Sequence, residues 1–364
     1  MTRSRTLPRA SGSTAPVVRS AVAGILLAGA LVGPASGAPS PAPSRNVRPA
    51  AAAQAKAEDL MGGRPFQIVL MEGQHVLMAA ASTGTSLITP VPLASISKAI
   101  TAMVVMQLVE EGSLDLDQTL ADVLPLELVT EPWRPTTIRQ LLTHQSGFSD
   151  DRTRWFNSSY DTCFEAFRLT VRRDSPTGRG SYEYSNTNFC ALSLVILFTT
   201  GVSYEEATYR YVFRPLGIRR QAMDPEYTNL LGAGGWRLSA LDTARIISAL
   251  DPRASISPLS VASRRAMIER TTYNYGLGVW IWADDTFGHS GSLNRARNIA
   301  VHLPSGRVAV ILTQASFPES GLDLLSDAES IDRAYAAACA TMCTSVGPDS
   351  FLGDVIQPVR RTYL

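Results

Sequence analysis

The first residues with a chemical signature form the tetrapeptide Ser95-Ile96-Ser97-Lys98, where a proline-containing loop gives way to an apolar, helix-like run. Residues three apart on a helix are neighbours, so the ammonium group of Lys98 can reach the hydroxyl of Ser95. A serine hydroxyl is a poor nucleophile until a neighbouring group takes its proton, and a lysine can do so only where its surroundings lower its pKa. A helix N-terminus supplies such a positive potential. The spacing therefore indicates a nucleophile beside a base.

The scarcity of lysine strengthens this interpretation. The chain has 33 basic residues, of which only Lys56 and Lys98 are lysines. Arginine does not lose its proton in proteins, so it could not serve as the base. A serine three places before a lysine is nevertheless common by chance, and the hypothesis needs further residues.

Two segments offer a phenol and a carboxamide two residues apart, Tyr184-Ser185-Asn186 and Tyr227-Thr228-Asn229. In extended backbone both side chains of such a segment point the same way. The spacing alone does not choose between the segments. We favour the first because Pro176, Gly178 and Gly180 precede it and indicate a loop.

A third candidate element is His289-Ser290-Gly291, which suits an edge strand where Gly291 permits a close backbone approach. Trp236 follows Gly234-Gly235 and is a candidate for the wall of a cleft. Arg295 and Arg297 lie just beyond the third element, and either is a candidate for binding a carboxylate, although a solvated surface position explains them equally well. His144, in Leu-Leu-Thr-His-Gln-Ser-Gly, is expected to close a helix and satisfy a buried loop.

The elements that must position these residues fall into three groups along the chain. Strand-like runs occur at 66–72 and 75–82, and again at 276–283, 298–303 and 307–314. Helical patterns occupy 98–111, 138–143, 191–199, 204–213 and 241–250, and 322–341 predicts a closing helix. The simplest architecture that fits this order is a sheet built from both chain ends, with helices on its faces and an all-helical subdomain inserted at roughly 113–240.

The composition and the chain ends limit the function classes. A formal net charge of +1 and 18% charged residues argue against a nucleic-acid partner. Residues 1–37 have four arginines, no acid and a 13-residue apolar run, which predicts a cleaved secretory signal rather than a stable membrane span, and hence an exported protein. The Pro- and Ala-rich residues 38–59 predict an unfolded linker, 60–342 the catalytic domain, and 343–364 a tail.

The cysteine pattern fits an oxidising compartment. Four cysteines allow three disulfide connectivities, and we favour Cys163 with Cys190 and Cys339 with Cys343. No C-x-x-C or clustered histidine supports a zinc site, so we expect neither a metal nor a cofactor.

Together these segments resemble the serine β-lactamase and penicillin-binding protein family, in the branch with D-alanyl-D-alanine carboxypeptidases, class C β-lactamases and related esterases. The matching segments stand in the family's order and span most of residues 60–342. They are Pro92 to Lys98, Glu111 to Asp117, Leu141 to Gly147, Tyr184 to Phe189, Tyr275 to Gly278 and Gly288 to Gly291. The resemblance implies an α+β fold, a three-layer α/β/α sandwich with an antiparallel sheet and an inserted helical subdomain.

The resemblance also implies roles for the residues. Ser95 would be acylated, and Lys98 would take its proton or lower the pKa of Tyr184, which would pass the proton to the leaving group. Asn186 would hold the substrate amide and Lys98, and His289 would supply positive or hydrogen-bonding potential. The backbone N–H groups of Ser95 and Ser292 would form the oxyanion hole, beside Ser290 and Gly291.

One departure from the family narrows the substrate. The third element is His-Ser-Gly where many β-lactamases have Lys-Thr-Gly, so the fixed ammonium that helps to hold a β-lactam carboxylate is missing. We expect an exported serine hydrolase acting on a D-amino-acid peptide, ester or amide, in the manner of a carboxypeptidase or esterase. Alternatives are a sensor of penicillins or peptidoglycan fragments that acylates without efficient turnover, and a weak β-lactamase. A small molecule or a peptidoglycan-derived peptide is the expected partner.

Overall fold

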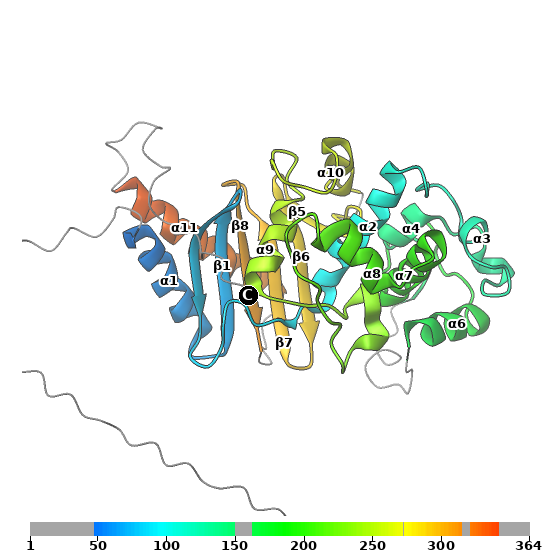
Figure 1. The fold of residues 1–364 in the computed structure, drawn as a ribbon, viewed down its shortest axis with the longest axis horizontal. Coiled ribbons are helices and arrows are strands. Elements are labelled where there is room, and N and C mark those ends of the chain that lie inside the picture. The colour runs from blue at the N-terminus through cyan, green and yellow to red at the C-terminus, as the bar shows by residue number, and fades with distance from the viewer. Residues whose placement is uncertain (1–46, 150–161, 272, 315–320, 342–364) are drawn as a thin grey trace, which may run out of the picture. The chain divides into compact units, whose positions relative to one another are not determined.

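A computed structural model of the chain describes residues 47–149, 162–271, 273–314 and 321–341. The predicted signal segment, the first part of the predicted linker and the predicted tail lie outside these residues. At the centre is a six-stranded sheet in the order β2-β1-β8-β7-β6-β5, in which every neighbouring pair is antiparallel (Figure 1). The strands are β1 (Phe66–Glu72), β2 (His75–Ala81), β5 (Trp280–Ala283), β6 (Thr286–Leu293), β7 (Ala296–His302) and β8 (Arg307–Thr313).

The central strands β1 and β8 are buried at nearly every position because both faces of the sheet are covered there. Ile68 and Leu70 of β1 point to one apolar cluster, whereas Val69 and Met71 point to another. The first cluster includes apolar side chains of α1 (Val47–Met61) and α11 (Gly321–Ala340). The second includes those of α2 (Ser97–Glu110) and α9 (Ala240–Ser248). The α+β sandwich with an antiparallel sheet made from both chain ends is confirmed.

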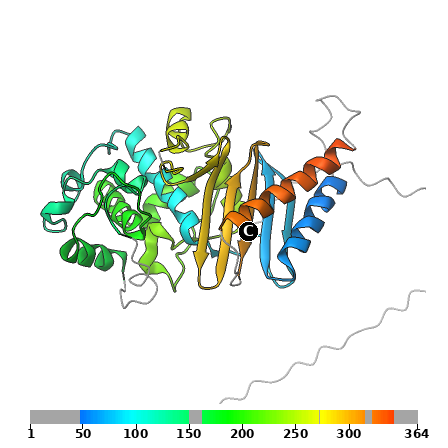
Figure 2. The same cartoon turned by 180° about the vertical axis from the view of Figure 1, so that it is seen from behind.

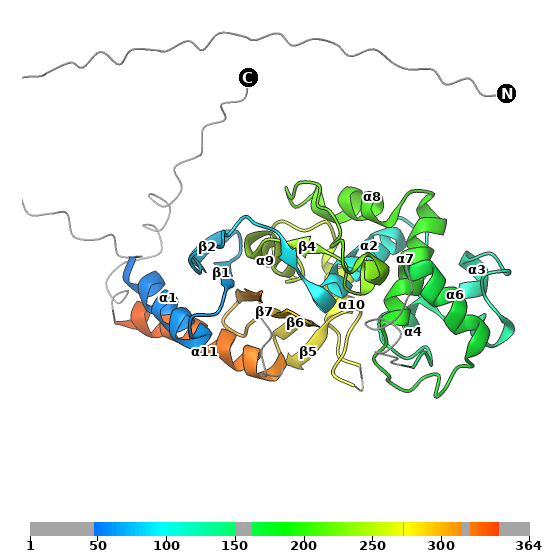
Figure 3. The ribbon, with the colours of Figure 1, turned by 90° about the horizontal axis from the view of Figure 1, so that it is seen from below.

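Figures 1 and 2 show α1 and α11 together on one side of the sheet, and Figure 3 shows α9 on the opposite side. The remaining helices come from the chain between β2 and β5, and several of them gather beyond the β6 end of the sheet (Figure 1). They are α3 (Leu120–Val123), α4 (Ile138–Leu142), α6 (Cys163–Arg173), α7 (Asn186–Thr200), α8 (Tyr204–Thr208), α10 (Val261–Met267) and the short helices η1 (Ala94–Ile96), η2 (Glu131–Trp133), η3 (Tyr209–Phe213) and η4 (Thr228–Ala233). A second, two-stranded sheet pairs β3 (Val91–Pro92) with β4 (Arg237–Leu238), and so joins the chain just before Ser95 to the chain just before α9.

Two expectations were wrong. The C-terminal part of the predicted linker is the helix α1, because its alanine run favours a helix and its residues Ala53, Ala57 and Met61 bury one face. The strand expected at 276–283 begins only at Trp280. Gly278 has a φ of +77°, which is not an extended conformation, and this turn brings it against Ala102 of α2.

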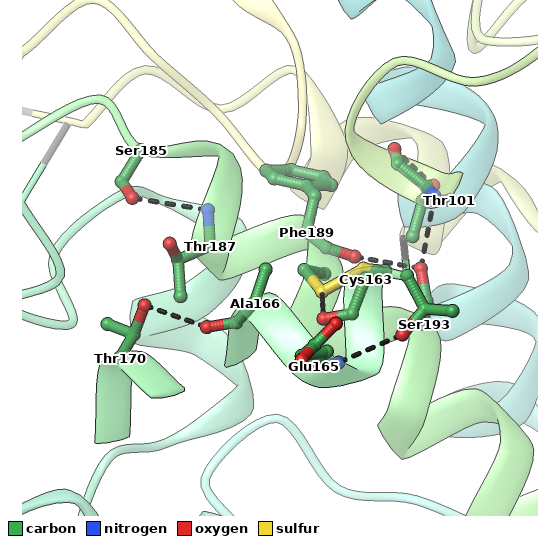
Figure 4. Close-up of a disulfide and its surroundings, with 12 residues drawn as sticks. Thr101, Cys163, Glu165, Ala166, Thr170, Ser185, Thr187, Phe189 and Ser193 are labelled. Carbon is green, nitrogen blue, oxygen red and sulfur yellow. Dashed lines mark hydrogen bonds between the residues drawn. A yellow bond between two sulfur atoms is a disulfide. The ribbon is translucent and has the colours of Figure 1, made fainter. Parts of the chain in front are cut away.

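A disulfide joins Cys163, the first residue of α6, to Cys190 in α7, with 5.6 Å between their Cα atoms (Figure 4). This predicted pairing is confirmed. It fixes α7 one turn after Asn186, where the candidate site begins. Cys343 lies outside the described residues, so its pairing with Cys339 stays a prediction.

The Cys163–Cys190 bond predicts a large contribution to stability. Replacing both cysteines by alanine opens a loop of 27 residues, and we expect the free energy of unfolding to fall by about 3 kcal/mol. Denaturant unfolding monitored by circular dichroism measures this. Cys339→Ser is the control, since a bridge to Cys343 would close only a very short loop. An unchanged midpoint in the double variant would show that the disulfide does not constrain the unfolded chain.

Candidate active site

Ser95 is the middle residue of η1, two positions before the first residue of α2, and it is partly exposed. The preceding residue, Ala94, has a φ of +54°, a left-handed conformation that costs a residue with a side chain about 1 to 2 kcal/mol. The backbone on this side is held by Leu93, whose N–H donates to the carbonyl of Trp236 at 2.8 Å. The turn therefore presents Ser95 at the start of the helix from a fixed backbone.

Lys98 follows in the first turn of α2 and is fully buried. Its Nζ atom donates to Ser95 Oγ at 3.1 Å, to Asn186 Oδ1 at 2.8 Å and to the carbonyl oxygen of Ala233 at 2.6 Å. A buried charge is tolerated only where it is paired or well hydrogen-bonded, and an ammonium has three protons to donate. One acceptor from the preceding turn and two from distant parts of the chain thus converge on this one nitrogen.

The Ala233 carbonyl is a functional contact that the sequence did not reveal. It belongs to η4, whose Gly232 carbonyl accepts from Thr101 Oγ1 at 2.8 Å and whose Gly232 N–H donates to Ser193 Oγ at 3.1 Å. A Cβ at Gly232 would lie 2.6 Å from both of these hydroxyl oxygens. Only glycine therefore lets the loop come close enough to bond Lys98, and the absence of a side chain at Gly232 is the one signal the sequence carries.

Tyr184 and Asn186 lie beside Lys98, as the first of the two candidate segments required. Ser185 between them is extended, with φ −143° and ψ 132°, so the two flanking side chains project to the same side. The Tyr184 ring centre lies 4.9 Å from Lys98 Nζ. In the other segment, Tyr227 accepts a hydrogen bond from the backbone of Asn294 at the β6–β7 turn.

Strand β6 brings the third element to the nucleophile. Strand β5 pairs with β6 only as far as Gly288. The part of β6 that follows pairs with β7 on one side and contacts η1 on the other. A Cβ added to Gly291 would lie 2.3 Å from the Leu93 carbonyl oxygen and 3.2 Å from the Ser95 backbone nitrogen. The predicted need for glycine at this close approach is met. Ser290 is partly exposed and Ser292 exposed beside it.

His289 is buried with both ring nitrogens bonded inside the protein. Nδ1 donates to the Ser290 carbonyl, and Nε2 accepts from the Tyr275 hydroxyl at 3.1 Å. Burial, followed by the nearby Lys98 charge, lowers the pKa of His289 to about 3. At neutral pH the residue is uncharged, so of the two roles expected for it only hydrogen bonding remains. Its partner Tyr275 was noted only as part of the matching segment Tyr275 to Gly278 and was given no role, because the spacing of a lone tyrosine indicates none.

The expectation that Trp236 walls a cleft was wrong. Its ring is fully buried, packs against Phe213 with centroids 4.8 Å apart, and donates from Nε1 to Tyr204 at 2.9 Å. The backbone of Trp236, not its side chain, serves the site through its bond to Leu93. Arg295 is exposed, and its role toward a carboxylate stays a prediction.

Within residues 47–149, 162–271, 273–314 and 321–341, no group of three or more His, Cys, Asp or Glu side chains is placed to hold a metal ion. Among the same residues, no single helix has the length and apolar character to cross a membrane, and only the bent pair Asn186–Thr200 with Tyr204–Phe213 meets both criteria when combined.

Comparisons with known proteins agree with this geometry. The sequence model of the family described as Beta-lactamase matches residues 67–330. Penicillin-binding protein 4 of Amycolatopsis lactamdurans is 36% identical over 137 residues, which are 36% of this chain and 35% of that protein. The chain therefore belongs to the beta-lactamase family, which includes the penicillin-binding proteins it was expected to resemble, and its match spans about a third of that relative's length.

Solved structures show the same fold. D-amino acid amidase from Ochrobactrum anthropi, complexed with D-phenylalanine, has a TM-score of 0.65 at 17% identity, covering 80% of this chain and 98% of that one. A D-stereospecific amidohydrolase from Streptomyces sp. has a TM-score of 0.62 at 21% identity, covering 77% of this chain and 98% of that one.

The contact at Gly291 predicts that Gly291→Ala pushes β6 away from η1. We expect acylation of Ser95 to slow at least about 100-fold, because a shift of about 1 Å in a catalytic group has an effect of this size. Intact-mass measurement of Ser95 labelling by a fluorophosphonate gives the rate. Gly306→Ala at the β7–β8 turn is the control: an added Cβ meets nothing within 4 Å, so the strain at its φ of +81° costs stability without displacing β6. Equal labelling rates for Gly291→Ala and the wild type would contradict the close approach.

Burial of His289 predicts acid sensitivity. Its folded pKa of about 3 lies below the value of 6.5 usual for histidine, so the unfolded chain binds more protons between these values and stability falls as the pH drops below about 6.5. One such histidine contributes a loss of up to about 1.4 kcal/mol per pH unit. We therefore expect the free energy of unfolding, measured with denaturant, to fall less between pH 7 and pH 5 in His289→Asn than in the wild type. His75→Asn, at an exposed position, should retain the wild-type difference.

Proposed function

We propose that this protein is a serine hydrolase that cleaves amides, peptides or esters of D-amino acids through an acyl-enzyme on Ser95. The observation that carries the proposal is the partly exposed Ser95 hydroxyl, 3.1 Å from a buried Lys98 ammonium that also bonds Asn186 and Ala233. Family membership supports the class of chemistry, and the structural likeness to a D-stereospecific amidohydrolase and a D-amino acid amidase supports the D-amino-acid substrates.

The reaction begins when Ser95 Oγ attacks the substrate carbonyl carbon and a C–O bond forms. The negative charge then develops on the carbonyl oxygen, for which the backbone N–H groups of Ser95 and Ser292 are the proposed donors. Removing one donor of this kind typically raises the barrier by about 3 to 4 kcal/mol. The close approach of Gly291 to the Ser95 nitrogen supports this arrangement.

The proton of Ser95 passes to the Lys98–Tyr184 pair and then from Tyr184 to the leaving amine or alcohol as the C–N or C–O bond breaks. Lys98 donates to three acceptors, an arrangement suited to the ammonium form. This favours the role in which Lys98 remains charged and stabilises negative charge on Tyr184, whose ring lies 4.9 Å from Nζ. Water then hydrolyses the ester of Ser95 and completes the turnover.

The neutral state of His289 supports a substrate without a carboxylate next to the leaving group. A lysine at this position would offer a permanent positive charge, whereas His289 offers none at neutral pH. Amides and esters of D-amino acids need no such charge on the leaving side. This weighs toward an amidase, aminopeptidase or esterase over a carboxypeptidase or β-lactamase. The predicted signal segment and the Cys163–Cys190 bond support an exported protein.

Hydrolysis of D-phenylalanine p-nitroanilide and D-alanine p-nitroanilide tests the proposal, with the L-isomers and diacetyl-L-lysyl-D-alanyl-D-alanine as comparison substrates. We expect kcat/KM to favour a D-amide over its L-isomer, and Ser95→Ala to lower it by at least about 1,000-fold. Ser97→Ala removes the other serine of the motif and should still be acylated. Activity retained in Ser95→Ala would overturn the assignment of the nucleophile.

Intact mass after incubation with benzylpenicillin separates the alternatives. A persistent adduct without hydrolysis of any amide or ester would replace the proposal with a sensor that acylates and does not turn over. Steady release of hydrolysed penicillin would favour a β-lactamase. Preferential cleavage of the D-alanyl-D-alanine substrate would favour a carboxypeptidase.

A further inference from the structure

The segment Thr143 to Gly147, which follows α4, lies against the loop that carries Tyr184. Gln145 and Gly180 exchange two hydrogen bonds, of 2.8 Å from the Gly180 N–H and 2.9 Å from the Gln145 side chain. The Thr177 N–H donates to the Gly147 carbonyl at 3.1 Å. The loop from Thr177 to Ser185 is therefore hydrogen-bonded at several points to one short segment, Thr143 to Gly147, which we call the template segment.

His144, in the template segment, holds the residues on both sides of Tyr184. Its backbone carbonyl accepts from the Glu183 N–H at 2.8 Å, and its ring atom Nδ1 accepts from the Ser185 N–H at 3.2 Å. The imidazole also packs on the Tyr184 ring, with centroids 4.3 Å apart. The N–H groups of the residues before and after Tyr184, and one face of its ring, thus contact this single residue.

The same ring nitrogen reaches the first turn of α7. Asn188 Nδ2 donates to His144 Nδ1 at 3.0 Å, and the other end of that amide accepts from Ser146 Oγ. Asn188 is two residues beyond Asn186, which bonds Lys98. His144 therefore connects the loop of Tyr184 with the helix start of Asn186.

Only a neutral imidazole can make these contacts. Because Nδ1 accepts from two donors, the proton is on Nε2, an atom that is buried without a hydrogen-bond partner. Burial, followed by the charges of Lys98 and His289, holds the pKa of His144 well below its usual value. A buried N–H donor without a partner costs stability. The tautomer that makes Nδ1 an acceptor therefore has an energetic cost, because it leaves the Nε2 proton without a partner. The φ of +57° at His144 adds to that cost.

We propose that His144 is a positioning residue for the reaction: its neutral imidazole fixes Tyr184 and Asn186 relative to Lys98 by accepting the Ser185 and Asn188 hydrogen bonds. The inference rests on the proposed acyl-enzyme function. It assigns His144 no contact with the substrate. A hydrophobic side chain of similar size would fill the space but would leave the Ser185 N–H without its acceptor.

Two variants separate the acceptor from the packing. His144→Asn keeps an acceptor oxygen near the place of Nδ1 and tolerates a positive φ, whereas His144→Leu keeps the bulk and loses the acceptor. We expect His144→Leu to lower kcat and the rate of Ser95 labelling by about 10- to 100-fold, with KM close to the wild-type value. His144→Asn should recover most of this loss. The substrates are the D-amino-acid p-nitroanilides, and the label is a fluorophosphonate.

His302→Leu is the matched control, because His302 is an equally buried histidine that bonds Asp251 instead of the site. It should lose stability with kcat unchanged. If His144→Leu and His144→Asn lose activity equally, or if His144→Leu behaves like His302→Leu, the acceptor does not position Tyr184 and the proposal is wrong.

Crystal structures of the two His144 variants test the positioning role independently of the proposed function. If the wild type shows neither turnover nor labelling of Ser95, the proposed function fails. The position of the Tyr184 ring in His144→Leu and His144→Asn then decides the positioning question alone. A displacement of about 1 Å or more in the leucine variant only, the size that matters for catalysis, supports the role. An unmoved ring in both variants overturns it.

Discussion

The hydrogen bonds of the buried Lys98 ammonium are the constraint on which the rest of this structure depends. A charge inside a protein is stable only where its protons find acceptors, and here the acceptors come from Ser95, Asn186 and Ala233. These residues lie 3, 88 and 135 positions away from the lysine in the sequence. The nucleophile turn, the start of α7 and the η4 loop must therefore converge, and most of the surrounding packing holds these three segments in place.

Further buried polar groups, which do not bond Lys98 themselves, hold the segments that carry its acceptors. Thr101 bonds both the Gly232 carbonyl and the Tyr204 hydroxyl, and Tyr204 in turn accepts from Trp236. On the opposite side, His144 and Asn188 hold the loop and helix that carry Tyr184 and Asn186. The site is thus supported from both sides by groups that do not touch a substrate.

The sequence predicted those parts of the fold that have a local signal. The strands at 66–81 and 298–313 are short β-favouring runs next to turn residues, and the helix after Ser95 has apolar residues at helical spacing; the structure places them within a few residues of the expected bounds. The alanine-rich helix α1 was missed because proline and alanine lack an apolar period, and only its docking on the sheet buries Ala53 and Ala57. Trp236 was misassigned because neighbouring glycines indicate a close backbone approach without saying which side of the chain is buried.

For the candidate site, residue types and spacing identified the groups that meet at Lys98, since Ser95, Tyr184 and Asn186 have side chains with recognisable chemistry. The Ala233 carbonyl has no such signature, because every residue carries one. The role of His144 depends on which loop packs against it, 41 residues further along the chain. Tertiary contacts of this kind follow from the fold and are not encoded in any local pattern.

The order of the sheet has a consequence for how the chain reaches this state. Strand β1 lies between β2 and β8, with Phe66 opposite Thr313, so a central pairing joins residues from the two ends of the domain. Contacts of such high sequence separation require a large loop to close before they contribute, which slows folding. During synthesis the helix of Ser95 and Lys98 emerges long before β6 and β8. Ser95 and Lys98 are therefore synthesised early, but the strand β6 that lies opposite Ser95 is missing until almost the whole chain has been made.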